Sequence, residues 1–171
     1  RIGAAFGIKV ISHDGARFTV MARALQAGDS ESALQVEPRM PLLYPLSIVA
    51  AEKITGDLRT AGQLLSILFG TLALIPIYLL ARAAWDVQVA QIAGAILAVF
   101  PEWTMLGGEV WTEPMFLCLF FSSIAAIWFA CEKPAIWKFA LAGLLGGLAV
   151  NTRPEGIYTV GGVASRPALA G

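Results

Sequence analysis

Residues 60–81 form an unbroken run of 22 positions without a charged side chain. A helix of about 20 apolar residues spans the hydrocarbon core of a bilayer, because in lipid every backbone amide must be satisfied within the helix. Pro76 interrupts the run and is expected to kink it. The run therefore predicts a membrane-spanning helix, which constrains the rest of the chain to fold beside a bilayer.

Three further apolar segments approach spanning length. Residues 87–101 are uncharged but short, and they span only if the flanking tryptophans lie in the interfaces. Residues 114–131 are also uncharged, whereas residues 135–150 contain Lys138 near their start, where a lysine can reach the interface. Only 14% of the chain is charged, against about 25% in soluble domains. The sequence therefore predicts an all-α fold, a polytopic transmembrane helical bundle. Residues 60–171 would form its transmembrane region, which we expect to be truncated.

The head, residues 1–59, is of mixed polarity and reads as the first external loop with juxtamembrane helices. Apolar residues recur at helical spacing in residues 14–27, and Gly28 follows them. Residues 46–54 predict an amphipathic helix that could lie flat in the membrane interface. The polar residues 29–41, with two prolines, are predicted to form a loop.

Loop charges predict the orientation of these segments. The loop 102–113 contains glutamates but no Lys or Arg, while Arg82, Lys133 and Lys138 lie on the other side. Basic loops stay cytoplasmic, so we expect the acidic loop, and with it the head, to be extracytoplasmic. The basic residues of the head itself argue against an extracytoplasmic head. However, the preference of Lys and Arg for the cytoplasmic side is weak in segments as long as this one. Acidic and basic residues balance at 12 each, which gives no reason to expect a nucleic-acid partner.

Two groups of carboxylates could carry chemistry. Asp14 stands at the start of a predicted helix, where it could act as a base at the membrane surface or simply cap the helix. Glu109 and Glu113 are four residues apart, so on a helix they share one face. They could bind a divalent cation or a polar substrate, or only complement the helix dipole.

Arginines supply the candidate cations. Arg153 follows the fourth apolar segment, and its guanidinium could clamp a phosphate through two hydrogen bonds. The alternative is that it marks where the helix meets lipid headgroups. Arg17 and Arg39 are weaker candidates for substrate binding, because charged residues in loops are usually only solvated.

Short motifs occur along most of the chain in a characteristic order. They are Asp14–Phe18, Met21–Leu25, Pro41–Pro45, Tyr78–Arg82, Thr112–Phe116 and Thr152–Glu155. Together they resemble the GT-C glycosyltransferases of the protein O-mannosyltransferase and aminoarabinose-transferase type (glycosyltransferase family 39). The chain looks like an N-terminal fragment of such an enzyme, and we expect the fragment to be inactive alone.

The resemblance implies a multi-pass enzyme of the cell membrane that takes sugar from a polyprenyl-phosphate donor. Transfer would be inverting and extracytoplasmic, to a protein, lipid or glycan acceptor. Asp14 takes the place of the family's catalytic acid, and Glu113 that of the acid in the second external loop. Many relatives carry a second acid where this chain has Gly15, so a divalent cation remains an open question.

Two other functions remain as alternatives. A transporter or lipid-handling protein would place charges along its route inside the spans. Lys138 is the only charge well inside a candidate span, and a transporter has no need of the long external head. A member of the family with only a scaffolding role is the other alternative.

Overall fold

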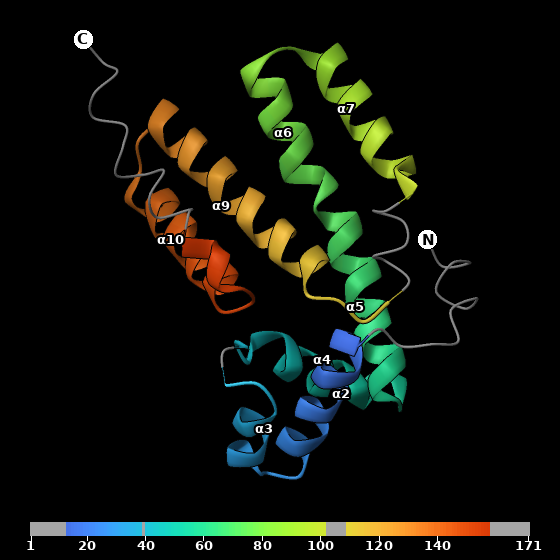
Figure 1. Cartoon of the computed structure of the whole chain (residues 1–171). Coiled ribbons are helices and arrows are strands. Elements are labelled where there is room, and N and C mark those ends of the chain that lie inside the picture. The colour runs from blue at the N-terminus through green and yellow to red at the C-terminus, as the bar shows by residue number, and fades with distance from the viewer. Residues whose placement is uncertain (1–12, 39, 102–108, 158–171) are drawn as a thin grey trace.

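The computed structural model describes residues 13–38, 40–101 and 109–157, and in these residues all regular structure is helical (Figure 1). The α-helices are α2 (His13–Gln26), α3 (Ser30–Val36), α4 (Leu43–Thr55), α5 (Leu58–Leu72), α6 (Leu74–Ala84), α7 (Val87–Val99), α9 (Glu113–Glu132) and α10 (Ile136–Val150); a 3-10 turn, η1, spans Pro154–Ile157.

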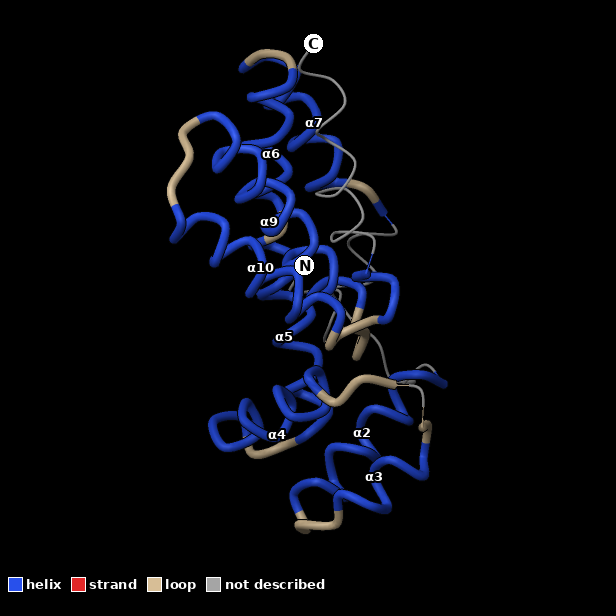
Figure 2. The backbone as a smooth tube through the Cα atoms, turned by 90° about the vertical axis from the view of Figure 1, so that its left-hand side faces the viewer, coloured by secondary structure: helices blue, strands red, loops and turns tan. Residues whose placement is uncertain are grey.

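Helices α2, α3 and α4 gather at one end of the molecule, and the longer helices extend away from them (Figures 1 and 2). The predicted loop 29–41 was wrong in its first half, because α3 occupies Ser30–Val36. Asp29 caps this helix by accepting from the Ser32 backbone N–H at 2.9 Å and from the Ser32 hydroxyl at 2.5 Å. The hydroxyl bond, and after it the N–H bond, lower the pKa of the Asp29 carboxyl. This cap stabilises a helix in a segment whose polar composition had predicted a loop.

The long apolar run forms two helices in succession. Asp57 caps the start of α5, accepting from the Thr60 N–H at 2.8 Å. Helix α5 ends at Leu72, four residues before Pro76, which has no N–H for the Leu72 carbonyl and whose ring would clash with it. Helix α6 resumes at Leu74, and the two together make a 27-residue unit long enough to cross a bilayer.

Helices α9 and α10 form an antiparallel hairpin (Figure 1). Near its middle, the buried Ser123 hydroxyl donates to the Ala142 carbonyl at 2.9 Å. At its closed end, Lys138 Nζ donates to the carbonyls of Phe129 and Lys133 at 3.2 and 2.8 Å. A cation at these carbonyls complements the negative end of α9.

Many large apolar side chains of the long helices face outward. On α7, Ile92 and Val99 are 61% and 76% exposed, and on α10, Ile136 is 90% exposed. Exposed large apolar side chains on several long helices mark a surface that contacts a membrane or a partner. The 20-residue α9 is also long and apolar enough to span a membrane, whereas α7 and α10 are shorter apolar helices. The chain is thus an all-α membrane protein.

The helix directions bring distant parts of the chain to the same end. Helices α5 and α9 both begin beside the α2–α4 group, and α10 returns to it (Figures 1 and 2). The main core lies at this junction, where Tyr44, Ile48 and Met21 pack with Val110 and Met115. Val110, in the segment just before α9, therefore packs against the head.

Candidate functional site

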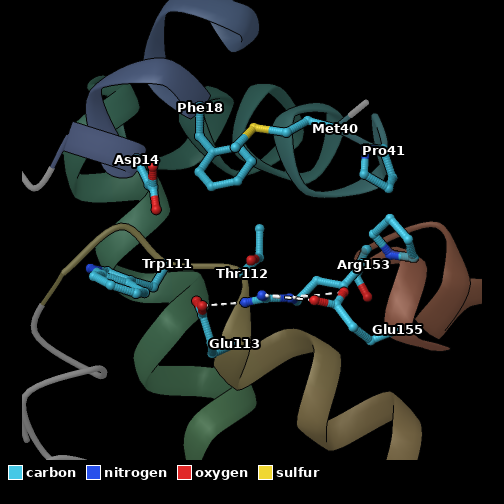
Figure 3. Close-up of a pocket in the computed structure, with 11 residues that line it drawn as sticks. Asp14, Phe18, Met40, Pro41, Trp111, Thr112, Glu113, Arg153 and Glu155 are labelled. Atoms are coloured by element: carbon cyan, nitrogen blue, oxygen red, sulfur yellow. Dashed lines mark hydrogen bonds and ion pairs between the residues drawn. The ribbon is translucent and has the colours of Figure 1, made fainter. Parts of the chain in front are cut away.

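A cavity of about 190 Å³ lies at the junction between the head and the long helices. Figure 3 shows side chains from four separate segments pointing toward it. Its walls come from α2, the segment before α4, the start of α9 and the turn after α10. The lining residues are Asp14, Phe18, Met40, Pro41, Trp111, Thr112, Glu113, Thr152, Arg153, Pro154 and Glu155.

Arg153 lies between two carboxylates in this cavity (Figure 3). Its Nη1 donates to Glu113 Oε1, while Nε and Nη2 donate to the two oxygens of Glu155 at 3.4 and 3.2 Å. Partial burial acts to lower the pKa of the guanidinium, but the bonds and charges of Glu155 and Glu113 outweigh it and raise that pKa. The Arg153 bonds in turn lower the pKa of Glu155. Arg153 and Glu155 therefore both favour their charged forms.

The turn after α10 brings Arg153 and Glu155 together. The Thr152 hydroxyl donates to the Ala149 carbonyl at 2.6 Å, and the Gly156 N–H donates to the Arg153 carbonyl at 3.0 Å. A Cβ at Gly156 would lie 2.5 Å from the backbone nitrogen of Val150, so only glycine allows this close return. The geometry of the Arg-Pro-Glu-Gly sequence thus depends on its last residue.

A buried hydrogen-bond network holds the segment that precedes Glu113. The Tyr44 hydroxyl lies 3.3 Å from the Gly62 carbonyl and 3.2 Å from Ser66 Oγ. Ser66 in turn bonds both the N–H and the carbonyl of Trp111, at 3.3 and 3.2 Å. Burial raises the pKa of Tyr44 well above its ordinary value, so the phenol stays neutral. The network joins α4 and α5 to the loop.

Close packing fixes the same loop from a second direction. Val110 is 1% exposed and lies against Gly62 of α5. A Cβ added at Gly62 would lie 2.7 Å from Val110 Cγ1, inside van der Waals contact. The absence of a side chain at Gly62 therefore lets the loop lie directly on the helix.

Asp14 enters the cavity from α2, across from Arg153 (Figure 3). Its side chain is 49% exposed, and His13 Nδ1 lies 3.8 Å from its Oδ1, a contact that is an ion pair only when the imidazole is protonated. Asp14 stands inside the first turn of α2 rather than before it. One turn on, Phe18 contacts Tyr44 edge-to-face, with ring centroids 5.2 Å apart, and this contact positions α2 over the cavity.

The other predicted site residues lie elsewhere. Glu109 does not line the cavity; it accepts from Trp111 Nε1 at 2.6 Å and so orients the indole ring that does. Arg17 pairs with Glu37 at 3.2 Å, which ties α2 to the chain after α3. Arg39 lies outside the described residues. Substrate-binding roles for these three residues stay predictions.

Several lining residues were not among the predicted site residues. Trp111 and Phe18 supply aromatic walls, and Glu155 supplies the second partner of Arg153. A signal existed for Trp111, which stands between the two glutamates singled out, and for Ser66, a polar residue in an apolar run. In the described part of the chain, no group of three or more His, Cys, Asp or Glu could hold a metal ion.

Comparison with known proteins adds one match. Residues 39–165 match the family described as dolichyl-phosphate-mannose-protein mannosyltransferase. Searches of curated proteins and of solved structures each gave no significant match. The matched range covers most of the chain and includes three of the four segments that form the cavity.

Proposed function

Because the chain belongs to the dolichyl-phosphate-mannose-protein mannosyltransferase family, whose members are membrane glycosyltransferases, we propose that it transfers a sugar from a polyprenyl-phosphate donor. The acceptor is a protein, lipid or glycan hydroxyl at the extracytoplasmic face. The single observation that supports this most is the shared cavity, which the carboxylates of Asp14 and Glu113 line together with Arg153, whose guanidinium bonds Glu113.

Asp14 and Arg153 have different roles in the proposed in-line displacement. The acceptor oxygen attacks the anomeric carbon while Asp14 takes the hydroxyl proton. The bond between that carbon and the phosphate oxygen breaks, and its electron pair leaves with the polyprenyl phosphate. Arg153 stabilises this leaving anion through charge-assisted hydrogen bonds. One displacement without a covalent intermediate inverts the anomeric centre.

The distribution of bases supports an extracytoplasmic cavity. Arg82, Lys133 and Lys138 lie near the ends of α6, α9 and the start of α10, away from the head (Figure 1). Basic residues favour the cytoplasmic side, so the cavity faces the opposite side and the chain crosses the bilayer several times.

The position of Lys138 also weighs against the transporter alternative. Lys138 was the charge inside a predicted span that could have marked a route for a solute. In the structure its ammonium group donates to two carbonyls at the end of α9. These bonds give the Lys138 ammonium a structural role at the closed end of the α9–α10 hairpin, so its presence in a predicted span does not require a transported ion.

The test replaces Asp14 with Asn in the intact protein in membrane vesicles, supplied with radiolabelled polyprenyl-phosphate mannose. Loss of the base is expected to lower transfer by about 10²- to 10⁴-fold with unchanged abundance. Asp29→Asn is the matched control, because Asn caps a helix as well as Asp and Asp29 lies outside the cavity. Wild-type transfer by the Asp14 variant, or a loss of protein equal to the loss of transfer, would contradict the role.

A further inference from the structure

The two carboxylates bound to Arg153 are held in different ways. Glu155 lies two residues away in the same turn and accepts from both Nε and Nη2. Glu113 lies on α9, 40 residues away in sequence, and accepts from Nη1 alone. A bidentate pair within one turn is geometrically fixed, whereas a single bond between two elements can be exchanged for another acceptor. Glu155 is therefore the lasting partner and Glu113 the replaceable one.

The net charge of the cavity lining is unfavourable for phosphate binding. Asp14, Glu113 and Glu155 line it with one guanidinium, so carboxylates outnumber cations. Arg153 is 32% exposed and Glu113 25%, so solvent screens this pair only in part. A phosphodiester that enters beside an already paired guanidinium meets like charge. Binding becomes favourable when the phosphate takes the place of one carboxylate.

We propose that the phosphate of the lipid-linked donor displaces Glu113 from Arg153 Nη1, while Glu155 continues to hold the other side of the guanidinium. The inference rests on the proposed function and adds an order of events to it. Before the donor binds, Glu113 is engaged by the arginine. After the exchange, its carboxylate faces the sugar and the acceptor, so an empty enzyme has no free carboxylate at this position.

The test measures binding of a short-chain polyprenyl phosphate, the donor without its sugar, to the purified intact protein in nanodiscs. Glu113→Gln removes the competing acceptor charge, and we expect the phosphate to bind about threefold to tenfold more tightly while transfer falls. Glu155→Gln is the matched control, since it removes the same charge from the same cavity. It is expected to bind no more tightly than wild type, because the guanidinium loses its fixed partner.

The outcomes separate the two proposals. If Glu113→Gln binds no more tightly, or Glu155→Gln tightens binding equally, the exchange is wrong and the glycosyltransferase proposal stands. If the wild-type protein neither binds polyprenyl phosphate nor transfers sugar, the proposed function itself fails. Glu113→Ala, which also removes the charge, gives the same comparison should the Gln variant be unstable in thermal unfolding.

Discussion

Replacing Gly62 with Ala tests whether close packing of the loop on α5 sets the position of Glu113. The new Cβ would lie 2.7 Å from Val110 Cγ1 and 3.0 Å from Cγ2. Carbon atoms pack at about 3.5–4.0 Å, so the loop must retreat by about 0.8–1.3 Å. Val110 is β-branched and buried, which leaves it little freedom to turn aside.

The size of the effect follows from that displacement. Overpacking of this kind costs about 1–3 kcal/mol of stability. Glu113 follows Val110 by three residues and should move with it, and a misplacement of about 1 Å can lower a rate about 100-fold. We expect Gly62→Ala to remain folded and to lose about one to two orders of magnitude in transfer of mannose from polyprenyl-phosphate mannose.

Two controls make the assay specific. Gly94→Ala and Gly147→Ala place the same methyl group where nothing lies within 4 Å, and both should transfer like wild type. Val110→Ala, added to Gly62→Ala, removes the two clashing carbons and should recover part of the activity. The reasoning is refuted if Gly62→Ala is fully active, or if the double variant transfers no better than Gly62→Ala.

Two further predictions concern stability. Tyr44→Phe removes the hydroxyl that bonds Gly62 and Ser66 and should lower the stability by about 0.5–1.5 kcal/mol, measured by thermal unfolding. Tyr78→Phe on α6 is the neutral control, and an unfolding midpoint of Tyr44→Phe equal to that of wild type would contradict the prediction. Asp57→Ala should cost about 0.5–2 kcal/mol at neutral pH. The bond from the Thr60 N–H lowers the pKa of Asp57 below 3.8, so its stabilisation is full above that pH and is lost as the pH falls through the folded-state pKa. The difference between wild type and variant should therefore vanish in acid, and a difference independent of pH would refute the charged cap.

The apolar segments could be read from the sequence because lipid makes length and charge decisive. The uncharged runs at 87–101 and 114–131 correspond to α7 at Val87–Val99 and α9 at Glu113–Glu132. Local capping was harder to weigh. In the head, α3 was missed because its residues are polar, although Asp29 provided a start signal.

The candidate site was only partly visible in the sequence. Asp14 and Glu113 are 99 positions apart, and nothing local says that they share a cavity; only the family resemblance suggested it. Of the two partners of Arg153, one is local in sequence and the other is distant. Glu155 is two residues away and could have been paired with it from the sequence, whereas the bond to Glu113 depends on how α10 packs against α9. Tertiary packing, which leaves no local pattern, decides such pairs.

The hairpin of α9 and α10 sets the register of the cavity's ion pair. Glu113 is the first residue of one arm and Arg153 follows the other, so sliding the arms by one residue, about 1.5 Å of helix rise, would pull the pair apart. The bond from Ser123 to Ala142 and the Lys138 bonds at the closed end resist that slide. Substitutions at these distant positions should therefore alter phosphate affinity without touching the cavity.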